Sequence, residues 1–275
     1  MDPMLVLKGA LPPIAAALLL VSLGGARLLP LAAAIGLYVA HGLVKGWPAW
    51  PHELWTAPVG REWLLWGVSA AGLLALLEHG RALPKRSAPG LAVAVAGATV
   101  WLLLTKKANQ WTSGEVLLHI GGGGVVAGLL VLASRRSLAK APAGVAPAIV
   151  WSTLLSIDAV LLTGGAAAFL GQLCGALAAA VGAAAGTTLW RRGFATTAAD
   201  GTWLAVGHVG FVLAGANLEQ VPWPAAGLAL AAPLPLLLLE RLGANTSLRW
   251  GVLGCLLAVV PASLSLLFVE LPKLG

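Results

Sequence analysis

The sequence predicts an all-α, polytopic integral membrane protein: a bundle of about ten transmembrane helices (9–10). Three observations lead there. Of the 275 residues, 59% are hydrophobic and only 10% are charged, against about 25% charged residues in a soluble domain. The mean hydropathy is +0.90. The apolar runs are long and do not alternate with polar residues, and backbone groups in lipid must be paired within their own segment, so helices are expected rather than a barrel.

Apolar runs between charged or turn-rich breaks predict ten spans, each near the roughly 20 residues of helix that cross a bilayer. The predicted spans are residues 9–26, 28–45, 62–78, 90–106, 115–134, 144–164, 166–190, 203–218, 221–240 and 250–270. The run at 203–218 is short, and the first run contains Pro12 and Pro13. Residues 1–275 are expected to form a single transmembrane domain.

Basic residues predict the orientation, because lysine and arginine collect in cytoplasmic connections. Placing both termini outside puts most of the basic residues inside, including Arg81, Lys85, Arg86, Arg135 and Arg136. The segment 45–62, which begins "KGWPAWPHELW", is then an extracytoplasmic Trp- and Pro-rich loop at the membrane interface, where tryptophan rings are favoured and prolines prevent a regular helix. We expect a multi-pass protein of the inner or plasma membrane with both termini extracytoplasmic.

Two further patterns concern packing. "LLALLEHGRAL" ends one predicted span and "LLLLERLGAN" ends another, which suggests a weak internal repeat of the kind that membrane carriers use. Four glycines follow His119, and such small residues let a neighbouring helix approach closely. The same glycines loosen the helix, as a bend at a binding site would require.

Six polar residues are predicted to share one depth in the outer part of the bundle: His41, Glu115, His119, Asp158, Gln172 and Asn217. An ionisable side chain within a span costs about 2.5–3.5 kcal/mol on insertion scales, so each requires a partner or a function. The first hypothesis is a small-solute or ion-coupled carrier, in which Asp158 and His119 bind a proton, a cation or a small polar solute and Glu115 orients the imidazole. The structural interpretation is that Asp158 pairs with His119 or Gln172 and locks two helices together.

The alternative hypothesis is the membrane subunit of a redox or other membrane complex, associated with haem or quinone or purely accessory. His41 and His119 lie beside glycines and are the candidate axial ligands of a haem b. His208 is placed near the opposite surface, without a partner at its depth. An accessory subunit would use its small-residue faces to contact other membrane proteins or a second copy of the chain.

Other classes find less support in the sequence. It contains no HExxH or GxSxG motif and no paired carboxylates of the DxxxD type, so an enzyme is less expected than a carrier. The basic residues are scattered without a tract that would bind nucleic acid. The expected partners are therefore the lipid bilayer and a small solute or ion. The sequence identifies neither the substrate nor any cofactor.

Overall fold

The structure, a computed structural model, describes residues 3–54, 60–165, 167–189, 194–218 and 221–269. These residues form helices and connections, and none of them lies in a strand. The α-helices are α1 (Pro3–Gly24), α2 (Leu29–Lys45), α3 (Pro51–Leu54), α4 (Trp63–His79), α5 (Ala88–Ala108), α6 (Ser113–Val116), α7 (Gly123–Ala139), α8 (Ala146–Gly164), α9 (Ala168–Gly186), α10 (Ala198–Leu218), α11 (Trp223–Ala231), α12 (Ser247–Gly254) and α13 (Val260–Leu264). Two π-helical turns, Leu117–Gly122 and Cys255–Val259, join α6 to α7 and α12 to α13.

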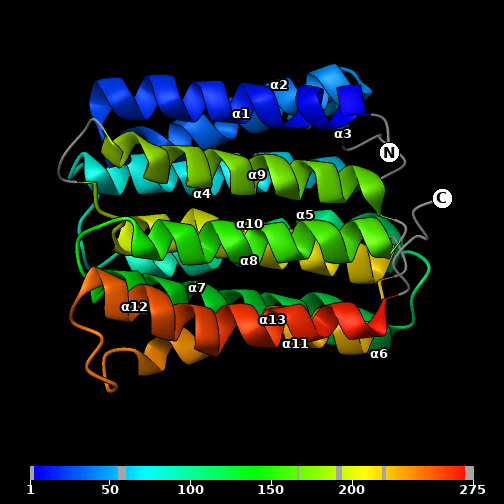
Figure 1. Cartoon of the computed structure of the whole chain (residues 1–275). Helices are drawn as coiled ribbons and strands as arrows, with labels where there is room; N and C mark the ends of the chain where they lie inside the picture. The colour runs from blue at the N-terminus through cyan, green and yellow to red at the C-terminus, as the bar shows by residue number, and fades with distance from the viewer. Residues whose placement is uncertain (1–2, 55–59, 166, 190–193, 219–220, 270–275) are drawn as a thin grey trace.

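Each of the ten predicted spans has a helical counterpart, and the predicted fold class is confirmed. Within the described residues, 8 helices are long and apolar enough to cross a membrane, and a shorter apolar helix covers Trp223–Leu238. The 17-residue α4 runs alongside them (Figure 1). The chain is thus a multi-pass helical membrane protein.

Prolines and side-chain caps set where several helices begin. Pro30 stands at the second position of α2, and α5, α8 and α11 begin in the same way. Proline is tolerated there because the first amides of a helix have no partner within the helix. Thr112 and Glu115 form a capping box at the start of α6, and Thr246 accepts a hydrogen bond from the Arg249 amide at the start of α12.

Two predicted boundaries are wrong. The span expected at 203–218 begins at Ala198, because Asp200 and its neighbours are buried and paired within the bundle rather than placed in a loop. The span expected at 221–240 is broken after Ala231 and continues as a 3₁₀ turn over Leu234–Leu238. Pro233 and Pro235 each lack the amide that a continuous helix needs.

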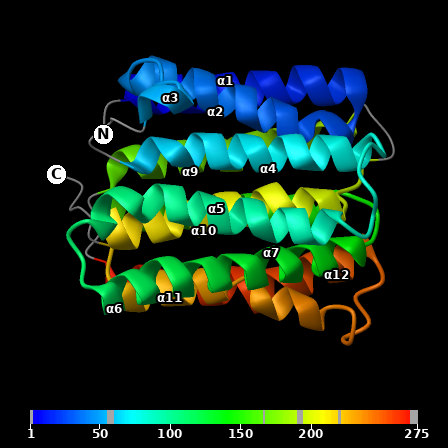
Figure 2. The same ribbon diagram turned by 180° about the vertical axis from the view of Figure 1, so that it is seen from behind.

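The long helices lie side by side in rows (Figures 1 and 2). The first row holds α1 and α2; the second α9 and α4; the third α8, α10 and α5; and the last α7 with α11, α12 and α13. The α10 helix is the core of the bundle, since 89% of its spanning window is buried. It packs against α4, α5, α7, α8, α9 and α11.

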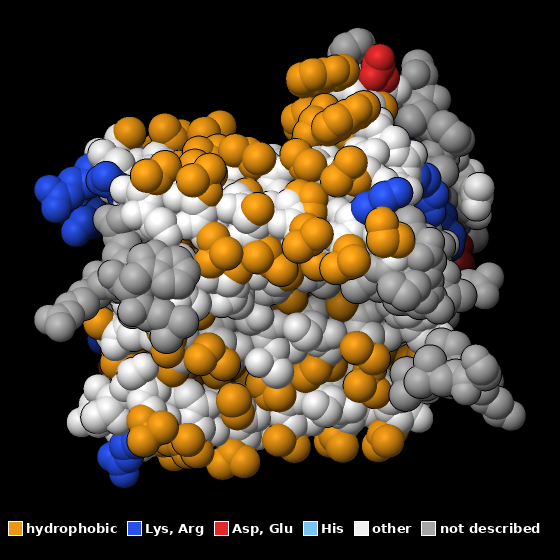
Figure 3. Space-filling view, turned by 45° about the horizontal axis from the view of Figure 1, so that its top comes forward, with side chains coloured by type: hydrophobic (Ala, Val, Ile, Leu, Met, Phe, Trp, Pro, Cys, Tyr) orange, Lys and Arg blue, Asp and Glu red, His pale blue; other side chains and the backbone are white. Residues whose placement is uncertain are grey.

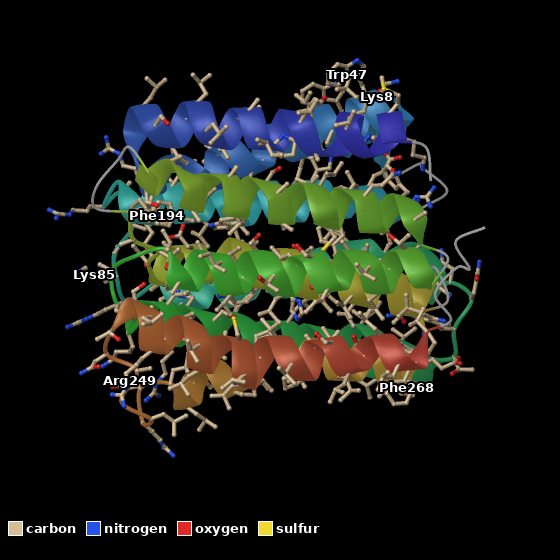
Figure 4. All side chains as sticks on the ribbon, in the orientation of Figure 1. Lys8, Trp47, Lys85, Phe194, Arg249 and Phe268 are labelled. Carbon is tan, nitrogen blue, oxygen red and sulfur yellow. The ribbon has the colours of Figure 1, made fainter. Side chains whose placement is uncertain are left out.

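The surface has the polarity that a bilayer requires. Hydrophobic side chains cover the middle of the face in Figure 3, and lysine and arginine gather toward its two ends. Lys8, Trp47 and Phe268 lie at one end of the bundle, the Trp47 end, and Lys85 and Arg249 lie at the other, the Lys85 end (Figure 4). The first helix, α1, which holds Lys8, therefore starts at the end of the bundle where the last helical turn, Ser265–Phe268, finishes.

The described part of the predicted interfacial loop folds against the Trp47 end. Trp47 and Trp50 are 66% and 56% exposed. The Trp66 indole donates a hydrogen bond to the carbonyl of Ala49, and the Ala49 amide donates to Glu62. The rest of this predicted loop, residues 55–59, lies outside the described residues.

Candidate functional site

A buried aspartate–histidine pair joins the two central helices α8 and α10. Nδ1 of His208 lies 2.6 Å from Oδ2 of Asp158, and each side chain is 1% exposed. The imidazole N–H donates to the carboxylate oxygen. His208 stands at the middle of α10, which begins at Ala198, so it meets Asp158 at the same depth. The prediction that His208 lies near one surface without a partner is wrong, because α10 extends further than its apolar run.

Aromatic and aliphatic side chains surround the pair. The fully buried ring of Trp151, two turns before Asp158 on α8, meets the His208 ring edge-to-face at a centroid distance of 6.3 Å. Cys174 of α9 is also fully buried and donates to the carbonyl of Leu155. The pair therefore sits in a region from which the packing excludes bulk water.

The glycines beside His208 serve helix packing. A Cβ at Gly207 would lie 2.7 Å from a side-chain carbon of Leu177, and one at Gly210 would lie 2.2 Å from a side-chain carbon of Leu64. These glycines let α9 and α4 approach α10 closely. The two helices therefore pack closely around the Asp158–His208 pair, and no space for a cofactor remains at Gly207 and Gly210.

Three polar atoms at this site have no hydrogen-bond partner in the described structure: Oδ1 of Asp158, Nε2 of His208 and Nε1 of Trp151. An unsatisfied buried polar atom costs about 1–3 kcal/mol, and a buried ion pair by itself stabilises a fold little. Three such atoms on the pair and on the tryptophan that contacts His208 are thus poorly explained by stability. Nε1 of Trp151 offers a donor and Oδ1 of Asp158 an acceptor, while Nε2 of His208 accepts when the imidazole is neutral and donates when it is protonated.

No protein-family model, curated protein or solved structure matches this chain. The candidate function is therefore argued from its own residues. Within the described residues, no group of three or more His, Cys, Asp and Glu side chains could hold a metal ion. Proton and hydrogen-bond chemistry is what the Asp158–His208 pair itself offers.

The structure does not place His119 beside Asp158. His119 lies in the π-helical turn between α6 and α7, and its ring contacts those of Trp111 and Trp223. Glu115 is exposed, and its carboxylate accepts hydrogen bonds from the amide and hydroxyl of Thr112. It caps a helix rather than orienting the imidazole. The predicted pairing of Asp158 with His119 is replaced by the pairing with His208.

The other predicted residues lie apart from the pair. His41 is 2% exposed, donates from Nδ1 to the Gly46 carbonyl at 2.8 Å and packs edge-to-face on Phe169. Asn217 donates to the Leu213 carbonyl near the end of α10, and its own carbonyl accepts from Lys107. Gln172 is half-buried on α9. Shared depth along the bundle did not mean contact across it.

The haem hypothesis needed His41 and His119 close together. His41 is on α2, in the first row, and His119 immediately precedes α7, in the last row (Figures 1 and 2). Packed helices are about 8–10 Å apart, and two further rows lie between these. The two imidazoles therefore cannot bind the same haem iron.

A buried ionic network at the Lys85 end was not predicted. Arg135 of α7 makes two 2.9 Å hydrogen bonds to the carboxylate of Glu78 on α4, and a third of 2.7 Å to Thr202 on α10. Next to it, Asp200 accepts from the Thr197 amide, the Trp203 indole and His79. The predicted spans place Arg135 in a connection after residue 134. The one available signal was the Thr197-to-Asp200 spacing, a helix-capping pattern.

Proposed function

We propose that this protein is a small-solute carrier of the inner or plasma membrane, and that the Asp158–His208 pair binds and releases the proton to which transport is coupled. The observation that carries the proposal is the isolated carboxylate–imidazole pair at the centre of the bundle, with polar atoms left over on both side chains. Ionisable residues within membrane spans mark ion and proton pathways.

The geometry supports a proton step in which the charge of the pair changes. With His208 protonated, the pair is a carboxylate and an imidazolium. Loss of that proton from the free Nε2 leaves a neutral imidazole that still donates from Nδ1, and a buried carboxylate whose charge is no longer balanced. In a medium of low dielectric constant an uncompensated charge is costly, so a change in protonation favours a change in how α8 and α10 pack. A carrier can couple that change to the binding of its solute.

The test is proton flux in proteoliposomes that contain a pH-sensitive dye. A panel of small polar solutes is added outside, and we expect some of them to change the internal pH. Asp158→Asn keeps the size of the side chain and cannot ionise, so the solute-dependent flux should fall at least tenfold, and His208→Gln should lose it as well. Glu240→Gln is the control, because it removes a half-exposed carboxylate that pairs with Lys140. Flux that is equal in Asp158→Asn and wild type, with folded protein in both, would contradict the proposal.

The proposed orientation has both termini extracytoplasmic. Its test is labelling of single introduced cysteines in intact cells with a maleimide that does not cross membranes. Trp47→Cys should react and Lys85→Cys should react only after the membrane is permeabilised. Native Cys174 is buried and Cys255 is half-buried, so the unsubstituted chain gives the background. The reverse labelling pattern would invert the orientation.

A further inference from the structure

A cavity opens from the lipid-facing surface at the Trp47 end, apart from the Asp158–His208 pair. Its volume is about 380 Å³, within the range of small-molecule sites. Residues from the α6–α7 segment, α10 and α11 line it: Leu118, His119, Gly122, Val126, Leu213 and Trp223. Leu118, Trp223 and Val126 are 68%, 45% and 37% exposed. Since these side chains belong to apolar helices, a ligand would enter from the bilayer.

The π-helical turn Leu117–Gly122 shapes this cavity. Such turns are rare and occur often at functional sites, and here the turn is followed by Gly123 and Gly124. A Cβ at Gly122 would meet no atom within 4 Å, so this glycine leaves space that no neighbouring helix fills. The glycine run after His119 therefore does two things. Gly123 is buried, and a Cβ there would lie 3.2 Å from Val100 and 3.4 Å from Leu213, so this glycine lets those side chains pack closely. Gly122 keeps the cavity open.

His119 is the polar group of the cavity. Its ring stacks on Trp111 at a centroid distance of 4.6 Å and lies 5.4 Å from Trp223. Among the described residues the imidazole makes ring contacts and no hydrogen bond. Its two nitrogens lie on the edge of the ring, so the stacking leaves them available to a ligand. The site thus offers flat aromatic surfaces, one hydrogen-bonding edge and apolar walls.

The described groups nearby give an anion no cationic partner. The six lining residues named above include no lysine or arginine. Lys107 lies 6.0 Å from the centre of the Trp111 ring, but its ammonium donates to the Asn217 carbonyl. Glu115, one turn before His119, is exposed and would repel an anion. Aromatic rings pair favourably with other rings in offset-stacked or edge-to-face arrangements.

We propose that this cavity binds a neutral, flat, lipid-soluble ring compound of the quinone or phenol type, with a ring oxygen hydrogen-bonded to His119 and the apolar part along Gly122 and Val126. This site is separate from the proposed proton pair, so Asp158→Asn should bind the compound as well as wild type does.

The experiment is quenching of tryptophan fluorescence by decylubiquinone, with the full chain in detergent. Wild type should show a saturable component, because Trp223 lines the site and Trp111 stacks on His119 next to it. Gly122→Leu fills the cavity and should weaken binding at least tenfold. Gly124→Leu is the matched control, since its Cβ also meets nothing within 4 Å but Gly124 does not line the cavity. His119→Phe keeps a stacking ring without nitrogens and should weaken binding severalfold. Gel filtration confirms that each variant is folded.

Three results would overturn the proposal. Quenching that rises linearly and equally in all variants means simple partition of the quinone into detergent. Unchanged binding in His119→Phe would show that His119 makes no hydrogen bond to the ligand, and the proposed ligand class depends on that bond. Saturable quenching by brominated stearate that Gly122→Leu abolishes, without saturable quenching by decylubiquinone, assigns the cavity to a lipid chain instead.

Discussion

Replacing Arg135 by alanine is expected to lower the free energy of unfolding by about 3–5 kcal/mol, the cost of breaking a buried ion pair. The guanidinium holds three helices together at the Lys85 end through its bonds to Glu78 on α4 and Thr202 on α10. Its side chain is 8% exposed and that of Glu78 is 17% exposed. Without the guanidinium, the Glu78 carboxylate loses its two hydrogen bonds to Arg135, and little water can reach it to replace them.

Arg136→Ala is the matched control for this prediction. Arg136 is the next residue of α7 and is exposed, and surface substitutions usually change stability by no more than about 0.5 kcal/mol. Denaturant unfolding of the purified protein in mild detergent measures both variants. The double variant Glu78→Ala with Arg135→Ala should lose less than the sum of the single losses, because it leaves no unpaired charge. Similar losses in Arg135→Ala and Arg136→Ala would show that the network does not stabilise the bundle.

The second large effect is expected at Gly201, where α10 crosses α7. A Cβ there would lie 2.6 Å from the backbone nitrogen of Arg135 and 2.7 Å from the carbonyl carbon of Ser134. Backbone atoms cannot turn aside as a side chain can, so even Gly201→Ala must push the two helices apart. We expect a loss of at least about 1–3 kcal/mol, the usual cost of overpacking, and disturbance of the adjacent Thr202–Arg135 bond.

Gly97→Ala is expected to change the free energy of unfolding in the opposite direction. Gly97 lies within α5, and a Cβ there would meet nothing within 4 Å. Alanine favours a helix over glycine by about 0.8–1.0 kcal/mol, so this variant should be slightly more stable than wild type. Unfolding of both variants under one set of conditions gives the comparison. A Gly201→Ala protein as stable as Gly97→Ala would mean that α7 and α10 do not pack as closely as described.

The predicted repeat of glutamate-ended spans stays a prediction, but the structure adds one relation between its two halves. Glu78 binds Arg135, and Glu240 lies 3.2 Å from Lys140. Both cations belong to the same helix end: Arg135 lies in the last part of α7, and Lys140 is its C-cap residue. Each glutamate thus pairs with a cation that lies far away in the sequence.

Only one of the two residues of the candidate pair could be predicted from the sequence. Asp158 was recognised because a carboxylate among leucines needs a partner, and this reasoning does not depend on the fold. Its partner was not recognised, because the predicted span begins at residue 203, after the buried Asp200, and this shifted the apparent depth of His208. An error of one or two helical turns at a span boundary moves a residue from the surface to the middle of the bundle.

Composition and hydropathy alone determined the helical membrane fold and the approximate position of each span, because lipid requires every segment to pair its own backbone and be apolar along its length. The tertiary structure decided which polar residues meet. Asp158 meets His208, and His119 turns toward two tryptophans instead. Hydropathy indicates how deep a residue lies along the bundle axis. Which helices become neighbours depends on close packing across that axis, such as Gly201 against α7. The hydropathy pattern of a single chain does not contain this information.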